Sequence, residues 1–408
     1  AGWIDDKTYI WTGDTSEDLS ETSNWKGGSH PPSGDNSVSI IVTKPTDNSH
    51  PLIFQTSDKK QAMVNFIIEE NAEAQIPAPS EGKSAILDVT GGCTNSGTLT
   101  NSGELTFKEI LSSSGTITNN NLITIENDFV STGTITNNGK LFIKGTAEIS
   151  GTYSGTNDSL YIINQDEDRK TVTINSPITI GTLYVAGNVD LELNADVTVT
   201  KFETNAGAEN FIDDNFIVNI GGTGSLTTSS MDFTRASNTD GVIGTYNLNV
   251  PVTCSGEIKT HSGSVLNINS DTQTNTLVHS ANDAKHQTLI NVKSNASLTV
   301  DGTVDGTIDL AANPNSGASL SVESGATVKA KSIIDTSTFA NGEGQIPLTN
   351  NGTIEVSESI DLTTISNSGT ITVPTINTSS ITNSGTITAT NAFTATNYLR
   401  PTASTSDV

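Results

Sequence analysis

Apolar and polar residues alternate along this chain in short runs that recur at nearly constant intervals. Between residues 97 and 153, runs such as T-I-T and L-T-F are separated by N-S-G and N-N-G clusters. Alternation with a period of two predicts strands with one buried face, and the clusters predict turns in which Gly and Asn accept left-handed backbone conformations. The positions that repeat with a step of 18 are Gly97, Gly115, Gly133 and Gly151; Leu99, Ile117, Ile135 and Tyr153; Leu105, Ile123 and Leu141; Phe107, Ile125 and Ile143; and Asn101, Asn119 and Asn137.

Short strands and turns that recur at this interval predict a β-solenoid, because one coil buries its apolar face only against the coils on either side of it. The repeat continues along the chain with other steps. Val172 corresponds to Leu191, ASLTV (296–300) to ASLSV (318–322), and Gly352 to Gly369 and then to Gly385. We therefore predict an all-β fold, a single-stranded parallel β-helix.

The coil length bears on the handedness of this helix. Apolar residues also recur at every sixth position between 99 and 141, which suits a left-handed hexapeptide helix. The step drifts along the chain, however, being shortest near Gly385 and longest between ASLTV and ASLSV. A three-sided hexapeptide prism tolerates little variation within a side. The sequence favours a right-handed helix, with the left-handed form as the alternative.

The pattern divides the chain into three regions. Residues 86–395 carry about 15 coils at roughly 20 residues a coil, and residues 396–408 form a short polar C-terminal tail. Residues 1–85 contain all the tryptophans and differ from both. We expect them to cap the first coil, since natural arrays cover an unpaired edge and an open core; a sugar-binding aromatic platform is the alternative. The cap residues are Trp3, Trp11 and Trp25.

The charge of the chain limits its partners. It has 19 Lys and Arg against 45 Asp and Glu, a net charge of -26, which disfavours binding to nucleic acid or to an anionic membrane. No apolar run is long enough to span a bilayer. The first residue is Ala, as in a mature protein whose signal peptide has been removed, and we expect secretion. Cys93 and Cys254 lie about eight coils apart, so we expect no disulfide between them.

The opening W-T-G … N-W at 11–13 and 24–25, followed by coils of the N-x-G-x-[IL]-T type, resembles bacterial surface β-solenoid proteins. These are the filamentous-haemagglutinin-like and autotransporter-passenger-like adhesins. The resemblance extends over nearly the whole chain, but its motifs are structural. It implies export and a role at the cell surface or outside the cell, and it transfers no catalytic residue.

Acidic clusters are the only candidates for catalysis or metal binding. NQDEDRK places Asp166, Glu167, Asp168 and Arg169 together, and FIDDNF contains Asp213 and Asp214. A polysaccharide lyase or hydrolase needs converging carboxylates, whereas neighbours on a strand point to opposite faces, so we expect no enzyme. We expect no cofactor, with Ca²⁺ as the alternative, because carboxylates in Gly-containing turns suit this ion. The calcium candidates are Asp301, Asp305 and Asp309, for which polar turns are the preferred interpretation.

Threonine pairs of the T-x-T type recur on consecutive coils and should face outward together. Such arrays resemble those of ice-binding β-solenoids, although threonine is also a favoured residue on any exposed strand. We expect the array to end where Tyr153 interrupts it. Its members are Thr98, Thr100, Thr116, Thr118, Thr134 and Thr136, and two later pairs are Thr370 with Thr372 and Thr386 with Thr388.

Coil sequence continues almost to Arg400, so the last coil should present free strand edges. We expect a structural or adhesive surface protein that assembles with itself, head to tail, into a filament, sheath or surface layer. Host or microbial glycans or proteins are further partners. A non-assembling adhesin or glycan-binding module, an ice-binding protein and a polysaccharide-degrading enzyme are the alternatives. The candidates for self-assembly are Ile381, Ile387, Phe393, Tyr398 and Leu399.

Overall fold

Parallel β-strands form almost all the regular structure of this protein. The computed structural model describes residues 7–32, 35–57, 60–80, 82–155, 158–204, 214–234, 243–280, 288–302, 306–310, 318–335 and 347–399, without the side chains of residues 398 and 399. In this part of the chain the one helix is the short 3-10 helix η1 (Thr22–Asn24). The chain forms two compact units, Ala1–Tyr184 with Asn194–Thr198, and Val185–Leu193 with Val199–Val408.

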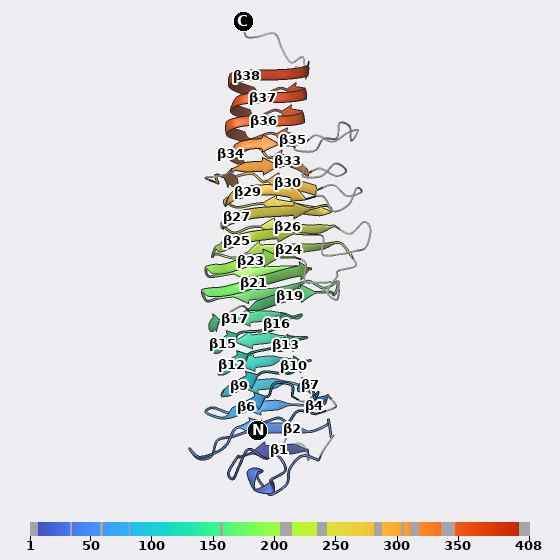
Figure 1. The fold of residues 1–408 in the computed structure, drawn as a ribbon, viewed down its shortest axis with the longest axis vertical. Coiled ribbons are helices and arrows are strands. Elements are labelled where there is room, and N and C mark those ends of the chain that lie inside the picture. The colour runs from blue at the N-terminus through green and yellow to red at the C-terminus, as the bar shows by residue number, and fades with distance from the viewer. Residues whose placement is uncertain are drawn as a thin grey trace. The chain divides into compact units, whose positions relative to one another are not determined.

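The first unit is a parallel β-helix with three sides, and each side is a ladder of strands from successive coils (Figure 1). One side contains β1 (Thr8–Trp11), β2 (Ser39–Val42), β5 (Phe66–Ile68), β8 (Cys93–Asn95), β11 (Leu111–Ser113), β14 (Phe129–Ser131), β17 (Ala147–Ile149) and β20 (Lys170–Ile174). The second contains β3 (Leu52–Ile53), β6 (Glu73–Ile76), β9 (Thr98–Asn101), β12 (Thr116–Asn119), β15 (Thr134–Asn137) and β18 (Thr152–Ser154). The third contains β4 (Gln61–Met63), β7 (Ile86–Val89), β10 (Glu104–Phe107), β13 (Leu122–Ile125), β16 (Lys140–Ile143) and β19 (Ser159–Asn164).

The step of 18 that the sequence predicts is confirmed as the register of this unit. Ile117 pairs with Leu99 on one side and with Ile135 on the other, and all three are buried. Successive side chains of a strand point to opposite faces, so the apolar residue of each T-x-T run lies in the core and both threonines lie outside. The apolar ladders therefore form the core of the unit.

The turn glycines have a different role from the one predicted. Gly115, Gly133 and Gly151 do not have positive φ angles. A Cβ atom at Gly133 would instead lie 1.9 Å from the carbonyl oxygen of Gly115, and one at Gly151 would lie 1.8 Å from that of Gly133. Glycine is required here because the turns of successive coils are in backbone contact.

The repeated asparagines lie inside the helix and not on exposed turns, contrary to the prediction. Asn101, Asn119 and Asn137 are fully or almost fully buried. The Asn101 side-chain amide donates to Oδ1 of Asn119 over 2.9 Å, and Asn119 donates to Oδ1 of Asn137 over 2.7 Å. Asn137 donates in turn to the hydroxyl of Tyr153, which donates to Asp158. The ladder thus satisfies side-chain polar groups that burial would otherwise make costly.

The second unit is also a parallel β-helix, but its strands are longer and bend around corners. One ladder contains β22 (Val189–Leu193), β24 (Phe216–Gly221), β26 (Gly244–Leu248), β28 (Ser264–Ile268), β30 (Thr288–Val292), β33 (Ala318–Val322) and β35 (Leu348–Asn350). The other contains β25 (Leu226–Phe233), β27 (Val252–His261), β29 (Thr272–Ser280), β31 (Ser297–Val300) with β32 (Thr307–Asp309), and β34 (Thr327–Ile334). Both ladders continue into β36 (Thr353–Asn367), β37 (Thr370–Asn383) and β38 (Thr386–Leu399), and β21 (Ile178–Gly187) and β23 (Val197–Glu203) contain the unit boundaries.

The predicted correspondence of ASLTV with ASLSV is wrong. ASLTV lies in β31 and ASLSV in β33, on different ladders of the second unit. Leu320 pairs with Ile290, and Leu298 pairs with Val328, so the coil is longer here than the sequence predicted. The shorter steps near the C-terminus are confirmed, since Thr353 pairs with Thr370 and Thr370 with Thr386.

Strand pairing begins well before residue 86, the predicted start of the coils. β1 pairs with β2, β2 with β5 and β5 with β8, all in parallel. The segment between β1 and β2 covers the outer edge of β1. Lys26 donates its backbone N–H to Ile10, and Thr12 donates its own to Asn24.

Two tryptophans seal this N-terminal coil. Trp11 and Trp25 are buried and pack edge to face with ring centroids 5.1 Å apart. The indole N–H of Trp11 donates to the carbonyl of His50, and that of Trp25 to the carbonyl of Leu19. Both rings are therefore part of the core of the first coils, whereas Trp3 lies outside the described residues.

The two cysteines lie in different units. Cys93 is in β8 and Cys254 in β27, and both thiols are free and buried. Burial raises the pKa of the Cys93 thiol far above its usual range. A thiol held in this neutral form is a poor nucleophile.

Candidate functional site

The last coil of the second unit has a strand on one side only. Among the described residues, β38 pairs with β37 and with no other strand (Figure 1). The pairing covers most of its length, from Thr386 opposite Thr370 to Leu399 opposite Thr382. A β-strand has hydrogen-bonding groups along both edges, and in the described part of the chain only the edge of β38 that faces β37 has a strand partner.

The apolar side chains of β38 are more exposed than those of β37. Ile371 and Ile376 of β37 are fully buried. Of their partners in β38, Ile387 is half-buried and Phe393 is 42% exposed. Ala389 is half-buried opposite the fully buried Val373. These three residues of β38 are therefore more exposed than the residues they pair with in β37.

The five predicted assembly residues do not all belong to this coil. Ile381 lies in β37 and is fully buried, so it is a core residue. Ile387 and Phe393 lie in β38 with partly exposed side chains. Tyr398 and Leu399 also lie in β38, but their side chains are outside the described part.

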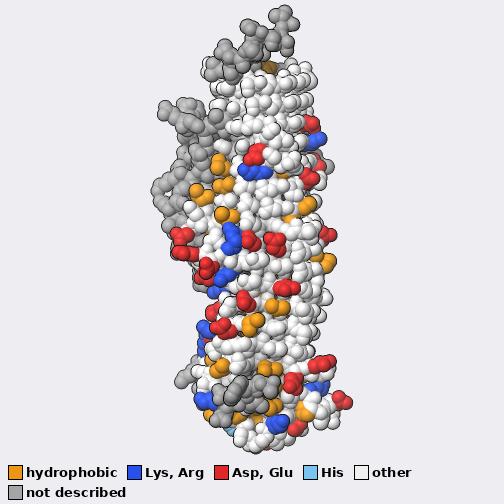
Figure 2. Space-filling model, turned by 180° about the vertical axis from the view of Figure 1, so that it is seen from behind, with side chains coloured by type: hydrophobic (Ala, Val, Ile, Leu, Met, Phe, Trp, Pro, Cys, Tyr) orange, Lys and Arg blue, Asp and Glu red, His pale blue; other side chains and the backbone are white. Residues whose placement is uncertain are grey.

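The coil of β38 is uncharged. β37 and β38 together contain no Asp, Glu, Lys or Arg, although the whole chain has a net charge of -26. Figure 2 shows the same contrast on one face, where charged side chains gather away from the last coils. Natural edge strands are usually blunted by charged residues or proline, and β38 has neither.

A second candidate surface is the outer face of the sheet formed by β3, β6, β9, β12, β15 and β18. The predicted threonine pairs lie in register on β9, β12 and β15. The array does not end at Tyr153, because that side chain points inward while Thr152 and Ser154 of β18 are exposed. Four adjacent strands thus present eight hydroxyl groups, spaced about 4.8 Å across strands and about 6.6 Å along them.

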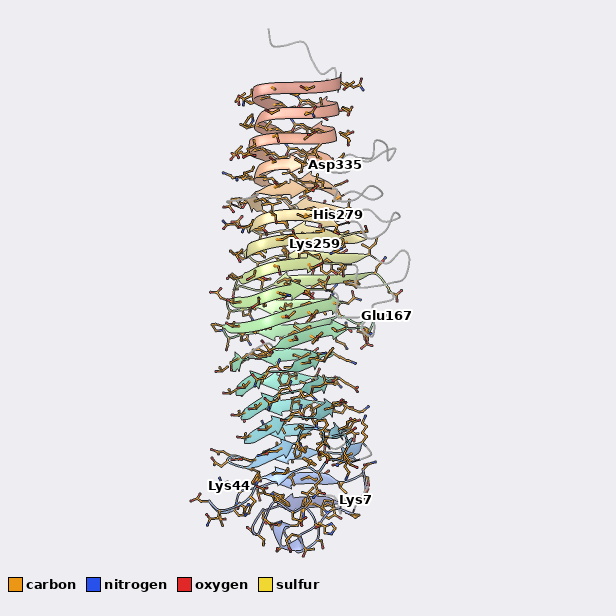
Figure 3. The ribbon with its side chains drawn as sticks, in the orientation of Figure 1. Lys7, Lys44, Glu167, Lys259, His279 and Asp335 are labelled. Carbon is orange, nitrogen blue, oxygen red and sulfur yellow. The ribbon has the colours of Figure 1, made fainter. Side chains whose placement is uncertain are left out.

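The acidic candidates do not converge. Residues 166–169 are all exposed in the loop between β19 and β20, where Figure 3 labels Glu167. Asp214 is exposed, and Asp213 lies outside the described residues. Two of the three calcium candidates are described: Asp301 follows β31 and accepts from the Gln273 amide, and Asp309 lies in β32, while Asp305 is outside. The described chain has no cluster of three or more His, Cys, Asp or Glu with metal-binding geometry.

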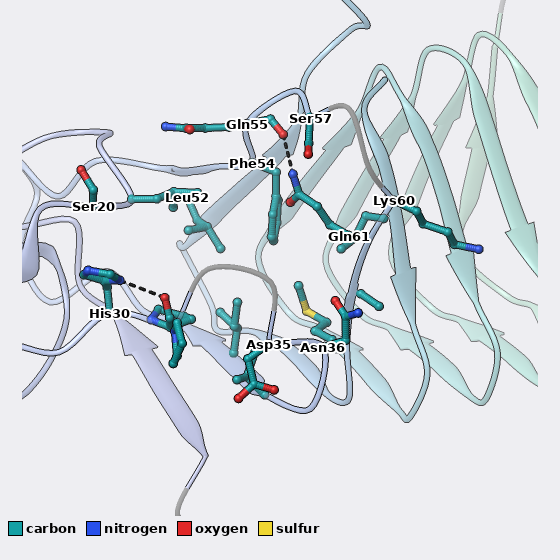
Figure 4. A pocket seen from close by; sticks show the side chains of 18 of the residues that line it. Ser20, His30, Asp35, Asn36, Leu52, Phe54, Gln55, Ser57, Lys60 and Gln61 are labelled. Carbon is teal, nitrogen blue, oxygen red and sulfur yellow. Dashed lines mark hydrogen bonds between the residues drawn. The ribbon is translucent and has the colours of Figure 1, made fainter. Parts of the chain in front are cut away.

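The first coils contain a cavity of about 800 Å³ that no sequence pattern indicated (Figure 4). Buried apolar side chains form its floor, and polar side chains form its rim. The floor includes Val38, Ile40, Leu52, Phe54, Met63 and Leu87, and the rim includes His30, Asp35, Asn36, Ser57, Lys60 and Gln61.

Several rim groups of this cavity are engaged with other protein groups. Gln61 donates to the carbonyl of Gln55, and Lys60 forms an ion pair with Asp88. Two hydrogen bonds from Ser37 lower the pKa of Asp35, whose carboxylate also lies 3.6 Å from the Lys7 ammonium. These three rim groups are therefore held by contacts within the protein.

Comparisons with known proteins assign this chain to no family. A scan of the chain against protein-family models found no match, and searches of curated proteins and of solved structures found none either. Among the described residues, no helix has the length and apolar character needed to cross a membrane. The parallel β-helix is thus established by the structure, and the resemblance to adhesins stays a prediction.

Proposed function

We propose that this protein is an extracellular structural and adhesive surface protein that associates with itself through its last coil. The observation that carries the proposal is the coil of β38, which combines an edge without a strand partner among the described residues, partly exposed apolar side chains and no charge. Edge strands of this kind are templates for pairing with another chain. The hydroxyl-rich outer faces are the surfaces proposed to contact host or microbial glycans or proteins.

The net charge supports an association limited to this coil. Copies that each carry a charge of -26 repel one another over most of their surfaces. The uncharged β37 and β38 permit approach without that repulsion. Apolar burial of Ile387 and Phe393 then favours the contact.

Electron microscopy and light scattering of the 408-residue protein test this proposal. We expect particles of more than one copy at micromolar concentration, both with and without millimolar Ca²⁺, since the contact uses no carboxylate. Single copies under every condition would contradict the proposal and direct attention to glycan binding. Association only with Ca²⁺ would show that a different contact is responsible.

Ice binding is a second candidate function, because the hydroxyl array has four strands where the sequence predicted three. The change Thr118→Lys places a long charged side chain in the middle of the array, whereas Thr124→Lys alters a matching half-buried threonine on the next side of the same coil. An ice-binding face predicts that the wild type and Thr124→Lys inhibit ice recrystallisation and that Thr118→Lys does not. Equal behaviour of all three proteins would exclude the array as an ice-binding site.

A further inference from the structure

One outer face of the second unit carries no charged side chain on its strands. These strands pair in the order β24, β26, β28, β30 and β33, and none of them contains Asp, Glu, Lys, Arg or His. The other ladder of the same unit has such residues on β25, β27, β29 and β34. On a chain with a net charge of -26, an uncharged face favours a neutral partner over a charged one.

A ladder of asparagines runs across this face from coil to coil. Asn291 donates its amide N–H to Oδ1 of Asn267 over 2.8 Å, and Asn267 donates to Oδ1 of Asn247 over 2.7 Å. Asn247 donates in turn to Asn219, and Asn219 to the carboxylate of Asp190 in β22, each over 2.6 Å. All five side chains are half-buried on the outer side of their strands. Successive amides therefore lie about 4.8 Å apart in fixed orientations.

These outer amides keep hydrogen-bonding groups that the ladder does not use. An asparagine amide has two N–H donors and two oxygen lone pairs, and the ladder engages one of each at Asn247 and at Asn267. The inner ladder of the first unit differs, because Asn119 donates to Asn137 and also to the carbonyl of Lys140. The second donor and second lone pair of each outer amide have no partner among the described residues. Groups that are already oriented in this way bind a ligand at a low cost in entropy.

A row of aliphatic and hydroxyl side chains lies beside the amides. Thr245, Val265 and Leu289 each precede a ladder asparagine by two residues, so they point to the same side of the sheet. They pair with one another across β26, β28 and β30, and Leu289 is 40% exposed. The outward positions of the five strands hold no aromatic side chain, although aromatic side chains are enriched in protein–protein interfaces. The face therefore suits a polar, neutral ligand better than another protein.

We infer that this face binds an extended neutral polysaccharide, which lies across the strands along the asparagine ladder. The inference rests on the glycan contact of the proposed function and assigns that contact to a face and a class of ligand. Sugar hydroxyl groups both donate and accept hydrogen bonds, as the second donor and lone pair of each amide require. In an extended polysaccharide these hydroxyl groups recur along one axis, as the amides do. The C–H groups of the sugar rings then pack on Val265 and Leu289.

Co-sedimentation of the 408-residue protein with insoluble polysaccharides tests the inference. The neutral probes are cellulose, chitin, curdlan and insoluble mannan, and the acidic control is cross-linked polygalacturonate. We expect binding to at least one neutral polymer and none to polygalacturonate. Binding to no neutral polymer, or equal binding to polygalacturonate, would overturn the inference. Either result would leave self-association through β38 standing, because light scattering measures that separately.

Two matched double variants locate the site. Asn247→Ala with Asn267→Ala removes two neighbouring amides from the ladder, and we expect about tenfold weaker binding because the hydrogen bonds of both amides to the ligand are lost. Gln273→Ala with Asn275→Ala removes two exposed amides from β29, on the other ladder, and should bind as the wild type does. Equal binding of the two variants would overturn the assignment to this face while leaving glycan binding in place.

A further variant separates ligand contact from the stability of the coils. Leu289→Lys removes no side-chain hydrogen bond and places a long charged side chain beside the ladder, at a position that is already 40% exposed. We expect it to weaken binding about as much as the loss of the two amides does. Urea unfolding of all variants confirms that they are folded. Wild-type binding by a folded Leu289→Lys variant would overturn the inference.

Discussion

Single buried side chains fix how each coil sits on the next. Asn119 makes four side-chain hydrogen bonds, with Asn101, Asn137, the carbonyl of Lys140 and the N–H of Asn121. A one-residue slip of the strand would turn it outward and break all four. The asparagine ladder therefore specifies register, whereas the surrounding aliphatic residues supply most of the burial.

The change Asn119→Ala tests this role. It removes the donor to the buried Oδ1 of Asn137 and one of the three acceptors of the buried Asn101 amide, and we expect the free energy of unfolding to fall by about 3 kcal/mol. Asn120→Ala removes a neighbouring but exposed amide and should cost less than about 0.5 kcal/mol. Urea unfolding of both variants measures the difference. An equal decrease in the free energy of unfolding would show that the buried asparagine ladder contributes no more to stability than an exposed amide.

At the scale of the strand, the sequence predicted alternation and register wherever the coil length changes little from one coil to the next. Ile117 pairs with Ile135, and Ile371 pairs with Ile354 and Ile387, as the repeat predicted. The prediction failed for ASLTV and ASLSV, because two similar strands on different sides of a coil cannot be told apart by their residues alone. Insertions between strands lengthen the coil there, so that Leu320 pairs with Ile290 and not with Leu298.

Other strand-scale features were missed because they depend on contacts between distant residues. The sequence shows that asparagine recurs but not that it points inward, since Asn is equally common in exposed turns. The role of Gly133 follows only from the distance to the backbone of Gly115 in the preceding coil. The cavity needs residues near 30, 54, 61 and 87 to converge, and no local pattern predicts that.

For the molecule as a whole, the contrast between its terminal coils explains the proposed association. The first coil uses the long segment between β1 and β2, with an internal hydrogen-bond network around the buried Asn24, to cover its edge and core. The last coil has no such cover among the described residues. Burial of apolar surface and pairing of edge groups both favour a partner there.

Hydrogen–deuterium exchange at low and high protein concentration tests the central claim most directly, because it measures the protection of the edge amides themselves. The account predicts slower exchange at high concentration in peptides from residues 386–399, with no change in peptides from residues 8–26. Phe393→Lys should abolish the change. Exchange in residues 386–399 that does not depend on concentration, or protection gained at the first coil, would contradict self-association through β38.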